Sequence, residues 1–172
     1  MSTVARKQGR LLQYRNKTNN ERINVSQLFW CGLMTLNSPD SESSKTAASF
    51  FAEFLHVCSQ DDEMRSTVAK SGKDLLATAL KAIGGAAPRQ SMPDFSDILF
   101  SMCQHCFAQY SAWLNELKHF PDIPCVNLDH GHKDRFFKQI VREVKSKRKF
   151  RDIIKEFTLV CRGMHGTDYA AG

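Results

Sequence analysis

Apolar side chains recur along this chain at intervals of three and four residues, the spacing that gathers them on one face of an α-helix. The pattern predicts helices over about 28–36, 46–58, 61–83, 92–106 and 110–117. No stretch shows the two-residue alternation that is typical of a half-buried β-strand. The sequence therefore predicts an all-α fold.

The strongest periodic pattern lies in residues 133–169 and predicts two more helices. The first has an apolar face made of Phe136, Phe137, Ile140, Val141 and Val144. The second repeats the pattern with Phe150, Ile153, Ile154, Phe157, Val160 and Cys161, and should end at Gly163, which adopts the left-handed conformation at little cost. Neither helix is stable alone in water, so both must pack against helices upstream.

Turn-forming residues separate these helices. The turn Asn37-Ser38-Pro39-Asp40 ends the first, Gly84-Gly85 ends the third, and the Pro-containing segment 120–129 forms an irregular connection. Ser91, followed by Pro93 and Asp94, is the pattern of a capped helix start similar to a capping box.

The spacing of the helices indicates how they assemble. Every second helix is expected to start near residues 46, 92 and 132, close to the roughly 40–47-residue period of HEAT and armadillo repeats. A closed bundle of six or seven helices would satisfy the same pattern, but regularly spaced antiparallel pairs favour an α-solenoid of about three pairs.

Composition separates a polar N-terminal arm, residues 1–27, from a HEAT-like helical region, residues 28–172. The arm is expected to be disordered. With 42% apolar residues the rest can form a core. We expect neither a membrane span nor a secretory signal, and a location in cytoplasm and nucleus. Five of six cysteines lie in apolar helical patterns, which favours reduced core thiols over disulfides: Cys31, Cys58, Cys103, Cys106 and Cys161.

The net charge of +6 is unevenly distributed. Residues 1–27 carry +5, residues 28–132 carry −5, and residues 133–156 carry +6. Such asymmetry indicates electrostatic selection of partners on particular faces, rather than general coating of nucleic acid.

The densest positive charge predicts a partner-binding basic face, made of Lys138, Arg142, Lys145, Lys147, Arg148, Lys149 and Arg151. Besides a solvated corner between helices, this run fits a nuclear-localisation-like peptide, a contact to RNA or DNA, or a surface for an acidic protein. Protein is favoured over nucleic acid, because the neighbouring aromatics, such as Phe136 and Phe150, are in phase with the buried stripe and cannot stack on bases.

The sequence gives little support for metal binding or catalysis. Cys103-Gln104-His105-Cys106, with Cys161 and His165, suggests a zinc site, but the helical phase of the cysteines favours core thiols. The histidines that flank the proline-containing connection are expected on the surface: His119, His130 and His132. No catalytic motif is present, so we expect no enzyme activity, no metal and no cofactor.

Several segments resemble one known family. They are Ala48–Leu55, Ala82–Gly85, Phe95–Phe100, His105–Phe107, Trp113-Leu114 and, most specifically, the tail Thr158–Tyr169, TLVCRGMHGTDY. From about Phe29 to Tyr169 the chain resembles the C-terminal HEAT-repeat region of the karyopherin-β (importin-β) nuclear transport receptors; residues 1–27 do not.

The resemblance implies a protein-binding fragment of a transport receptor that carries cargo proteins between cytoplasm and nucleus. In the family, the GTPase Ran in its GTP form is held mainly by N-terminal repeats, which have no counterpart in this sequence. Cargo lies on the concave surface, in some complexes against the C-terminal arch. Two alternatives remain open: a small basic nucleic-acid-binding protein, and a truncated product without transport activity of its own.

Overall fold

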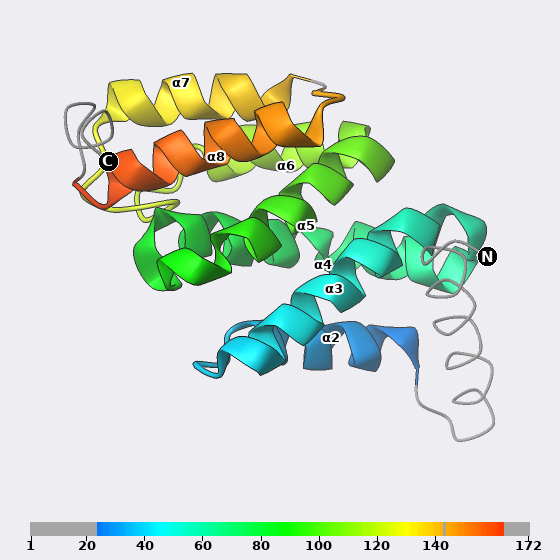
Figure 1. Ribbon diagram of the computed structural model, residues 1–172. Helices are drawn as coiled ribbons and strands as arrows, with labels where there is room; N and C mark the ends of the chain where they lie inside the picture. The colour runs from blue at the N-terminus through cyan, green and yellow to red at the C-terminus, as the bar shows by residue number, and fades with distance from the viewer. Residues whose placement is uncertain (1–23, 143, 164–172) are drawn as a thin grey trace. The chain divides into compact units, whose positions relative to one another are not determined.

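The computed structural model describes residues 24–142 and 144–163 (Figure 1). Within these residues all regular structure is helical, as the sequence predicted. The chain forms two compact units, residues 1–72 and residues 73–172, and their boundary falls inside one helix, α4, which spans Asp62–Lys81. Each unit is described by itself.

The first unit begins with helix α2, Val25–Leu36. The side chain of Asn24 caps it by accepting a hydrogen bond from the backbone N–H of Gln27 at 2.7 Å, so the helix starts slightly before the predicted residue 28. Asn37 ends the helix, which confirms the predicted turn.

Helix α3, Ser41–Val57, begins earlier than the predicted start near Thr46. The reason is a cap: the carboxylate of Asp40 accepts a hydrogen bond from the backbone N–H of Ser43 at 3.3 Å, which starts the helix directly after the turn. Every second helix starts at residue 41, 92 or 130, and these starts are less evenly spaced than the apolar pattern indicated.

Helices α2 and α3 pack against each other (Figure 1), and aromatic side chains join them. The ring of Phe29 lies edge-on to Phe51 and Phe54, with centroids 5.0 and 5.4 Å apart. Gly32 makes the close approach of the helices possible, because a Cβ atom there would lie 2.8 Å from the Phe51 ring. These contacts form the core of the first unit.

Helix α4, Asp62–Lys81, opens as predicted. The carboxylate of Asp61 accepts the backbone N–H of Met64 at 2.9 Å and completes an N-terminal cap. The helix ends in a π-helical turn, Ala82–Ala86, in which Gly85 has a φ of 131°. The predicted termination at Gly84-Gly85 is therefore confirmed.

The start of helix α5, Met92–His105, corrects one prediction. Ser91 belongs to a short 3₁₀ turn, Arg89–Ser91, has helical backbone angles and makes no side-chain cap. The capping box predicted at Ser91 was wrong, because the chain enters the helix through this turn and Ser91 is buried.

A break at Cys106 separates α5 from helix α6, Phe107–Leu117. Cys103 is buried, as predicted, whereas Cys106 lies at the break and is only half-buried. The prediction of core thiols was therefore wrong for Cys106, because the helix ends just before it, and for Cys31, which lies on the exposed face of α2. The helix α6 buries Tyr110, Leu114 and Leu117.

Helices α7, His130–Val141, and α8, Lys147–Cys161, run antiparallel beside each other (Figure 1). The rings of Phe136 and Phe157 stack with centroids 3.5 Å apart. Gly163, with a φ of 75°, follows α8 and confirms the predicted stop.

The end of α7 corrects a second prediction. The helix stops at Val141 and Arg142 is extended, so Val144 does not continue the apolar face of α7. Side chains of α5 and α6 bond the carbonyl groups at this end instead: Tyr110 donates to Ile140 at 2.8 Å and Gln104 donates to Val144 at 2.7 Å. These hydrogen bonds from other helices replace the backbone hydrogen bonds that a longer α7 would have made.

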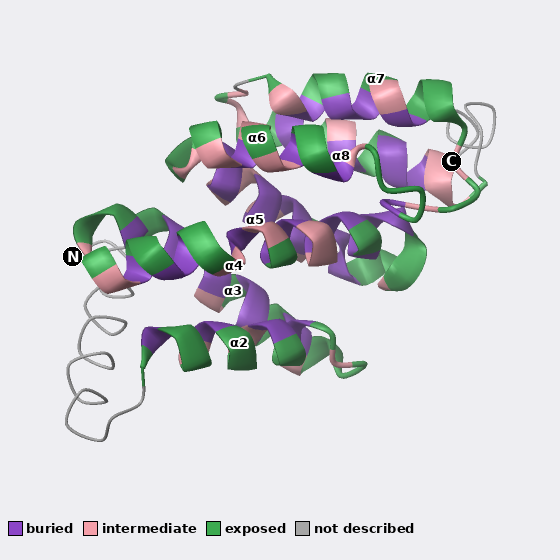
Figure 2. Cartoon of the chain, turned by 180° about the vertical axis from the view of Figure 1, so that it is seen from behind, coloured by how far each residue is buried: buried purple, intermediate pink, exposed green. Residues whose placement is uncertain are grey.

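In the second unit, α8 packs against α5 and against the π-helical turn Ala82–Ala86, which lies before α5 in the chain. Figure 2 shows buried residues along α5 and α8, and these two helices pack against each other. The guanidinium of Arg162 donates to the carbonyl of Ala87 at 2.5 Å, and the hydroxyl of Thr158 contacts the Met92 sulfur at 3.7 Å. The end of α8 is thereby fastened to the start of α5.

Burial and a hydrogen bond make Tyr110 a pH-sensitive part of this core. Burial raises the pKa of the Tyr110 phenol well above its usual value near 10. The neutral phenol therefore stabilises the fold fully below about pH 10, and this contribution declines as the pH rises further. The variant Tyr110→Phe should lose about 1–2 kcal/mol at neutral pH, because the Ile140 carbonyl loses its donor.

Urea unfolding measured from neutral to alkaline pH checks this prediction. The wild type should lose stability above about pH 10, and Tyr110→Phe should show a flatter profile there. An equal alkaline decline in both proteins would show that another group is responsible.

Candidate functional site

The connection between α7 and α8, together with the start of α8, carries most of the predicted basic face. Besides the bond from Gln104 to Val144, the thiol of Cys103 lies 3.9 Å from the carbonyl oxygen of Arg142. Two residues at the end of α5 thus hold the connection in place. The cations that it presents consequently have a defined position relative to α5.

Helix α8 begins with an unfavourable arrangement of charge. Lys147, Arg148 and Lys149 occupy its first turn, which contains no acidic residue, and Ser146 caps it by accepting the N–H of Lys149 at 3.3 Å. Cations at a helix N-terminus are repelled by the positive end of the helix dipole. The first turn of α8 is therefore a concentrated source of positive potential.

One carboxylate from α5 neutralises part of this charge. The guanidinium of Arg151 donates to both carboxylate oxygens of Asp97, at 2.9 and 3.1 Å, and the Lys147 ammonium lies 3.6 Å away. These groups are substantially exposed, so each pair contributes only about 0.2–1 kcal/mol. Asp97 was not recognised from the sequence, because nothing in its local pattern reveals a partner 54 positions along the chain.

Four other cations, two in the connection and two in the first turn of α8, are available to a partner. Arg142, Lys145, Arg148 and Lys149 are exposed, and none of them forms an ion pair within residues 24–142 and 144–163. We call these four residues the basic corner. They are the part of the predicted face that has charge to offer a partner.

Lys138 lies apart from the basic corner. It projects from α7, forms an ion pair with Asp134 at 3.0 Å, and lines a small hollow of about 70 Å³ beside Leu114 and Asn115 of α6. A side-chain hydrogen bond from Lys138 lowers the pKa of Asp134. The predicted face is therefore divided into Lys138, the pair Lys147 and Arg151 that binds Asp97, and the basic corner.

The cysteines and histidines do not assemble a metal site in the described residues. No group of three His, Cys, Asp or Glu side chains there could hold a metal ion. Burial raises the pKa of the Cys161 thiol to about 12, and His165 lies outside the described residues. The histidines that flank the proline-containing connection are exposed, as predicted: His119, His130 and His132.

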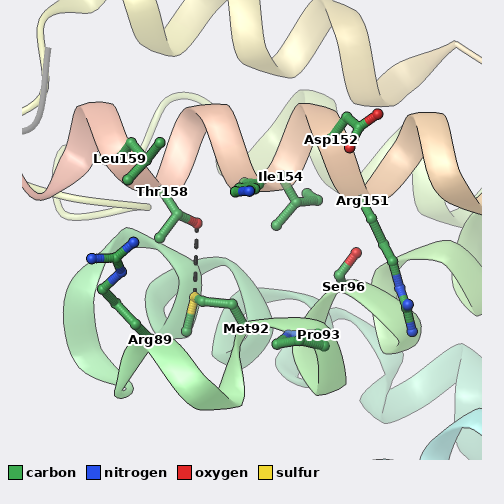
Figure 3. A pocket seen from close by; sticks show the side chains of 10 residues that line it. Arg89, Met92, Pro93, Ser96, Arg151, Asp152, Ile154, Thr158 and Leu159 are labelled. Atoms are coloured by element: carbon green, nitrogen blue, oxygen red, sulfur yellow. Dashed lines mark hydrogen bonds between the residues drawn. The ribbon is translucent and has the colours of Figure 1, made fainter. Parts of the chain in front are cut away.

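A groove between α5 and α8 is the second feature of this unit (Figure 3). It has a volume of about 290 Å³. Apolar side chains form most of its wall: Met92, Pro93, Ile154 and Leu159. Charged residues border it: Arg89, Arg151, Asp152 and Lys155. Nothing in the sequence predicted this groove, since it forms only where two helices far apart in the chain meet.

The architecture defines a class of protein. A solved structure of importin13 in its cytosolic state superimposes with a TM-score of 0.76 at 22% identity, over 84% of this chain and 16% of that one. The prediction of a HEAT-type α-solenoid of antiparallel helix pairs is therefore confirmed.

Sequence comparison identifies the relatives within this class. Residues 36–110 match the importin 13 repeat family. The chain is 41% identical over 151 residues to importin-13 from Bos taurus and from Homo sapiens, which covers 88% of this chain. The predicted resemblance to karyopherin-β nuclear transport receptors is confirmed, and within that family the similarity lies with importin-13.

The chain spans only a small part of these receptors, 16% of the length of each curated relative.

Within residues 24–142 and 144–163, no helix has the length and apolar character needed to cross a membrane.

Proposed function

We propose that this chain works by binding proteins, as a cargo-contacting segment of a nuclear transport receptor. The observation that carries the proposal is its similarity to importin-13 over nearly nine-tenths of its length. On this proposal, the chain acts without catalysis and without a cofactor. Complementary shape and charge over a helical-repeat surface provide the binding.

The basic corner gives the proposed binding its charge preference. Arg148 and Lys149 lie at the positive end of α8 and have no ion-pair partner in the described part of the chain. An acidic protein surface would gain attraction from both the side chains and the helix dipole. We therefore propose acidic proteins as the partners of this corner.

The wider transport cycle follows from the same similarity. We propose that the chain operates in cytoplasm and nucleus, and that Ran in its GTP form is bound by N-terminal repeats that are not among the residues of this sequence. By itself, this chain should then show little affinity for Ran. Its role in the transport cycle would then be limited to selecting cargo.

Charge reversal of the basic corner tests the proposal. The double variant Arg148→Glu with Lys149→Glu should reduce recovery of acidic partners from nuclear extract by roughly tenfold or more, because attraction becomes repulsion. Both residues are exposed, and carboxylates in the first turn of α8 suit the helix dipole, so the melting temperature should not fall. Quantitative mass spectrometry of proteins retained by each variant provides the measurement.

The matched control reverses two exposed lysines of the first unit, Lys45→Glu with Lys70→Glu, and should retain the same partners. Identical partner sets for the wild type and the Arg148, Lys149 variant would contradict the role of the corner. Tight, strongly salt-dependent binding to RNA or DNA would favour the nucleic-acid alternative. Against that alternative, Phe136, Phe150 and Phe157 are at most 5% exposed and offer no stacking surface.

A further inference from the structure

We propose that the groove between α5 and α8 binds a short acidic peptide segment of a partner, with an apolar side chain inserted between the helices. This proposal rests on the proposed protein-binding function and assigns it a second site, separate from the basic corner. Three features of the groove support it: its size and apolar wall, an unpartnered buried hydroxyl, and an excess of cations at its rim.

The groove is large enough for one or two aliphatic side chains. Its volume of about 290 Å³ lies near the lower end of the range for ligand sites, roughly 300–1,000 Å³. Met92 and Pro93 on α5 face Ile154 and Leu159 on α8, and the Thr158 hydroxyl meets the Met92 sulfur between them (Figure 3). The wall is aliphatic rather than aromatic, which suits leucine-like side chains.

Ser96 supplies a polar group without a partner. This residue is 2% exposed, lines the groove, and its hydroxyl has no hydrogen-bond partner in the described structure. Figure 3 shows the hydroxyl pointing from α5 toward α8. A buried hydroxyl without a partner is destabilising, and the backbone of a peptide in the groove would provide both a donor and an acceptor for it.

The rim of the groove favours negative charge. Arg89, Arg151 and Lys155 border it, against the single carboxylate of Asp152. Arg151 is held by Asp97, whereas the exposed guanidinium of Arg89 has no ion-pair partner among the described residues. Carboxylates beside an inserted apolar side chain would therefore be attracted to the Arg89 side of the groove.

Fluorescence anisotropy with a defined probe tests this proposal. The probe is a short fluorescein-labelled peptide with a leucine pair flanked by glutamates on both sides. We expect saturable binding that weakens about tenfold or more when the leucines become alanines. Replacing the glutamates with glutamines should weaken binding several-fold and remove its salt dependence.

Variants of the protein locate the site. Arg89→Glu should weaken probe binding about tenfold. Ser96→Ala should weaken it about threefold without lowering the melting temperature, because it removes an unpartnered hydroxyl. Lys45→Glu, a matched charge reversal of an exposed residue of α3 that lies outside both the groove and the basic corner, should leave probe binding within about twofold of the wild type.

Several results would overturn the proposal. The first is no binding of the probe. The second is equal binding by the wild type, Arg89→Glu and Ser96→Ala. The third is loss of binding in Arg148→Glu alone, which would place the probe on the basic corner. Displacement of the probe by a short RNA, but not by excess unlabelled peptide, would assign the groove to nucleic acid instead. If the probe fails while acidic partners still require Arg148 and Lys149, the groove proposal fails and the proposed function stands.

Discussion

Replacing Gly84 with alanine is expected to lower the free energy of unfolding by about 3 kcal/mol. An alanine Cβ at this position would lie 2.1 Å from the backbone carbonyl oxygen of Pro124. A Cβ atom is fixed rigidly to its own backbone, and the carbonyl oxygen of Pro124 is part of the backbone in the packed second unit. Neither atom can therefore move aside as the end of a flexible side chain would. The urea concentration at the unfolding midpoint should fall substantially. Far-UV circular dichroism measures the unfolding.

The adjacent glycine separates this clash from backbone strain. A Cβ at Gly85 would meet nothing within 4 Å, but its φ of 131° is one that other residues rarely adopt. Gly85→Ala should therefore cost only roughly 1 kcal/mol. Equal effects of the two substitutions would show that the connection around Pro124 moves to relieve the contact.

Replacing Phe150 with alanine is expected to cost about 3–5 kcal/mol. Its side chain is fully buried at the start of α8, and its ring lies edge-on to Phe100 of α5 with centroids 5.5 Å apart. Removing the ring leaves a cavity between the two helices that its neighbours cannot fill. Chemical denaturation of the variant and the wild type measures the loss.

Ile153 provides the matched control on the same helix. The apolar periodicity treats Phe150 and Ile153 as members of one buried face, but Ile153 is only half-buried. Ile153→Ala should therefore cost about 1 kcal/mol or less. A loss as large as that of Phe150→Ala would indicate that Ile153 is covered by a contact absent from the described residues.

Local signals predicted the helices well, but tertiary contacts displaced several of their ends. Asp61 caps α4 at the predicted start of the helix, and Gly163 follows the end of α8 as predicted; both act within one turn of the chain. Ser91 did not, since the preceding turn already supplies the entry to α5. The apolar pattern extends α7 to Val144, but the helix ends at Val141, where side chains of α5 and α6 bond the backbone.

The candidate sites were predicted only in part. The positive charge of residues 142–151 is a property of composition, so the sequence located it. Which cations remain unpaired depends on Asp97, which binds Arg151 and Lys147 from another helix. The groove lined by Ser96 and Ile154 had no sequence signal at all, because its walls come from α5 and α8.

The sequence by itself determined the all-helical class, the helix pairs and the likeness to transport receptors. Periodicity and capping act over a few residues and are therefore visible in the chain. Only the tertiary structure decided where α7 ends, which cations Asp97 neutralises and where a groove remains open. These depend on contacts between residues far apart in the chain, and such contacts exist only after the helices pack.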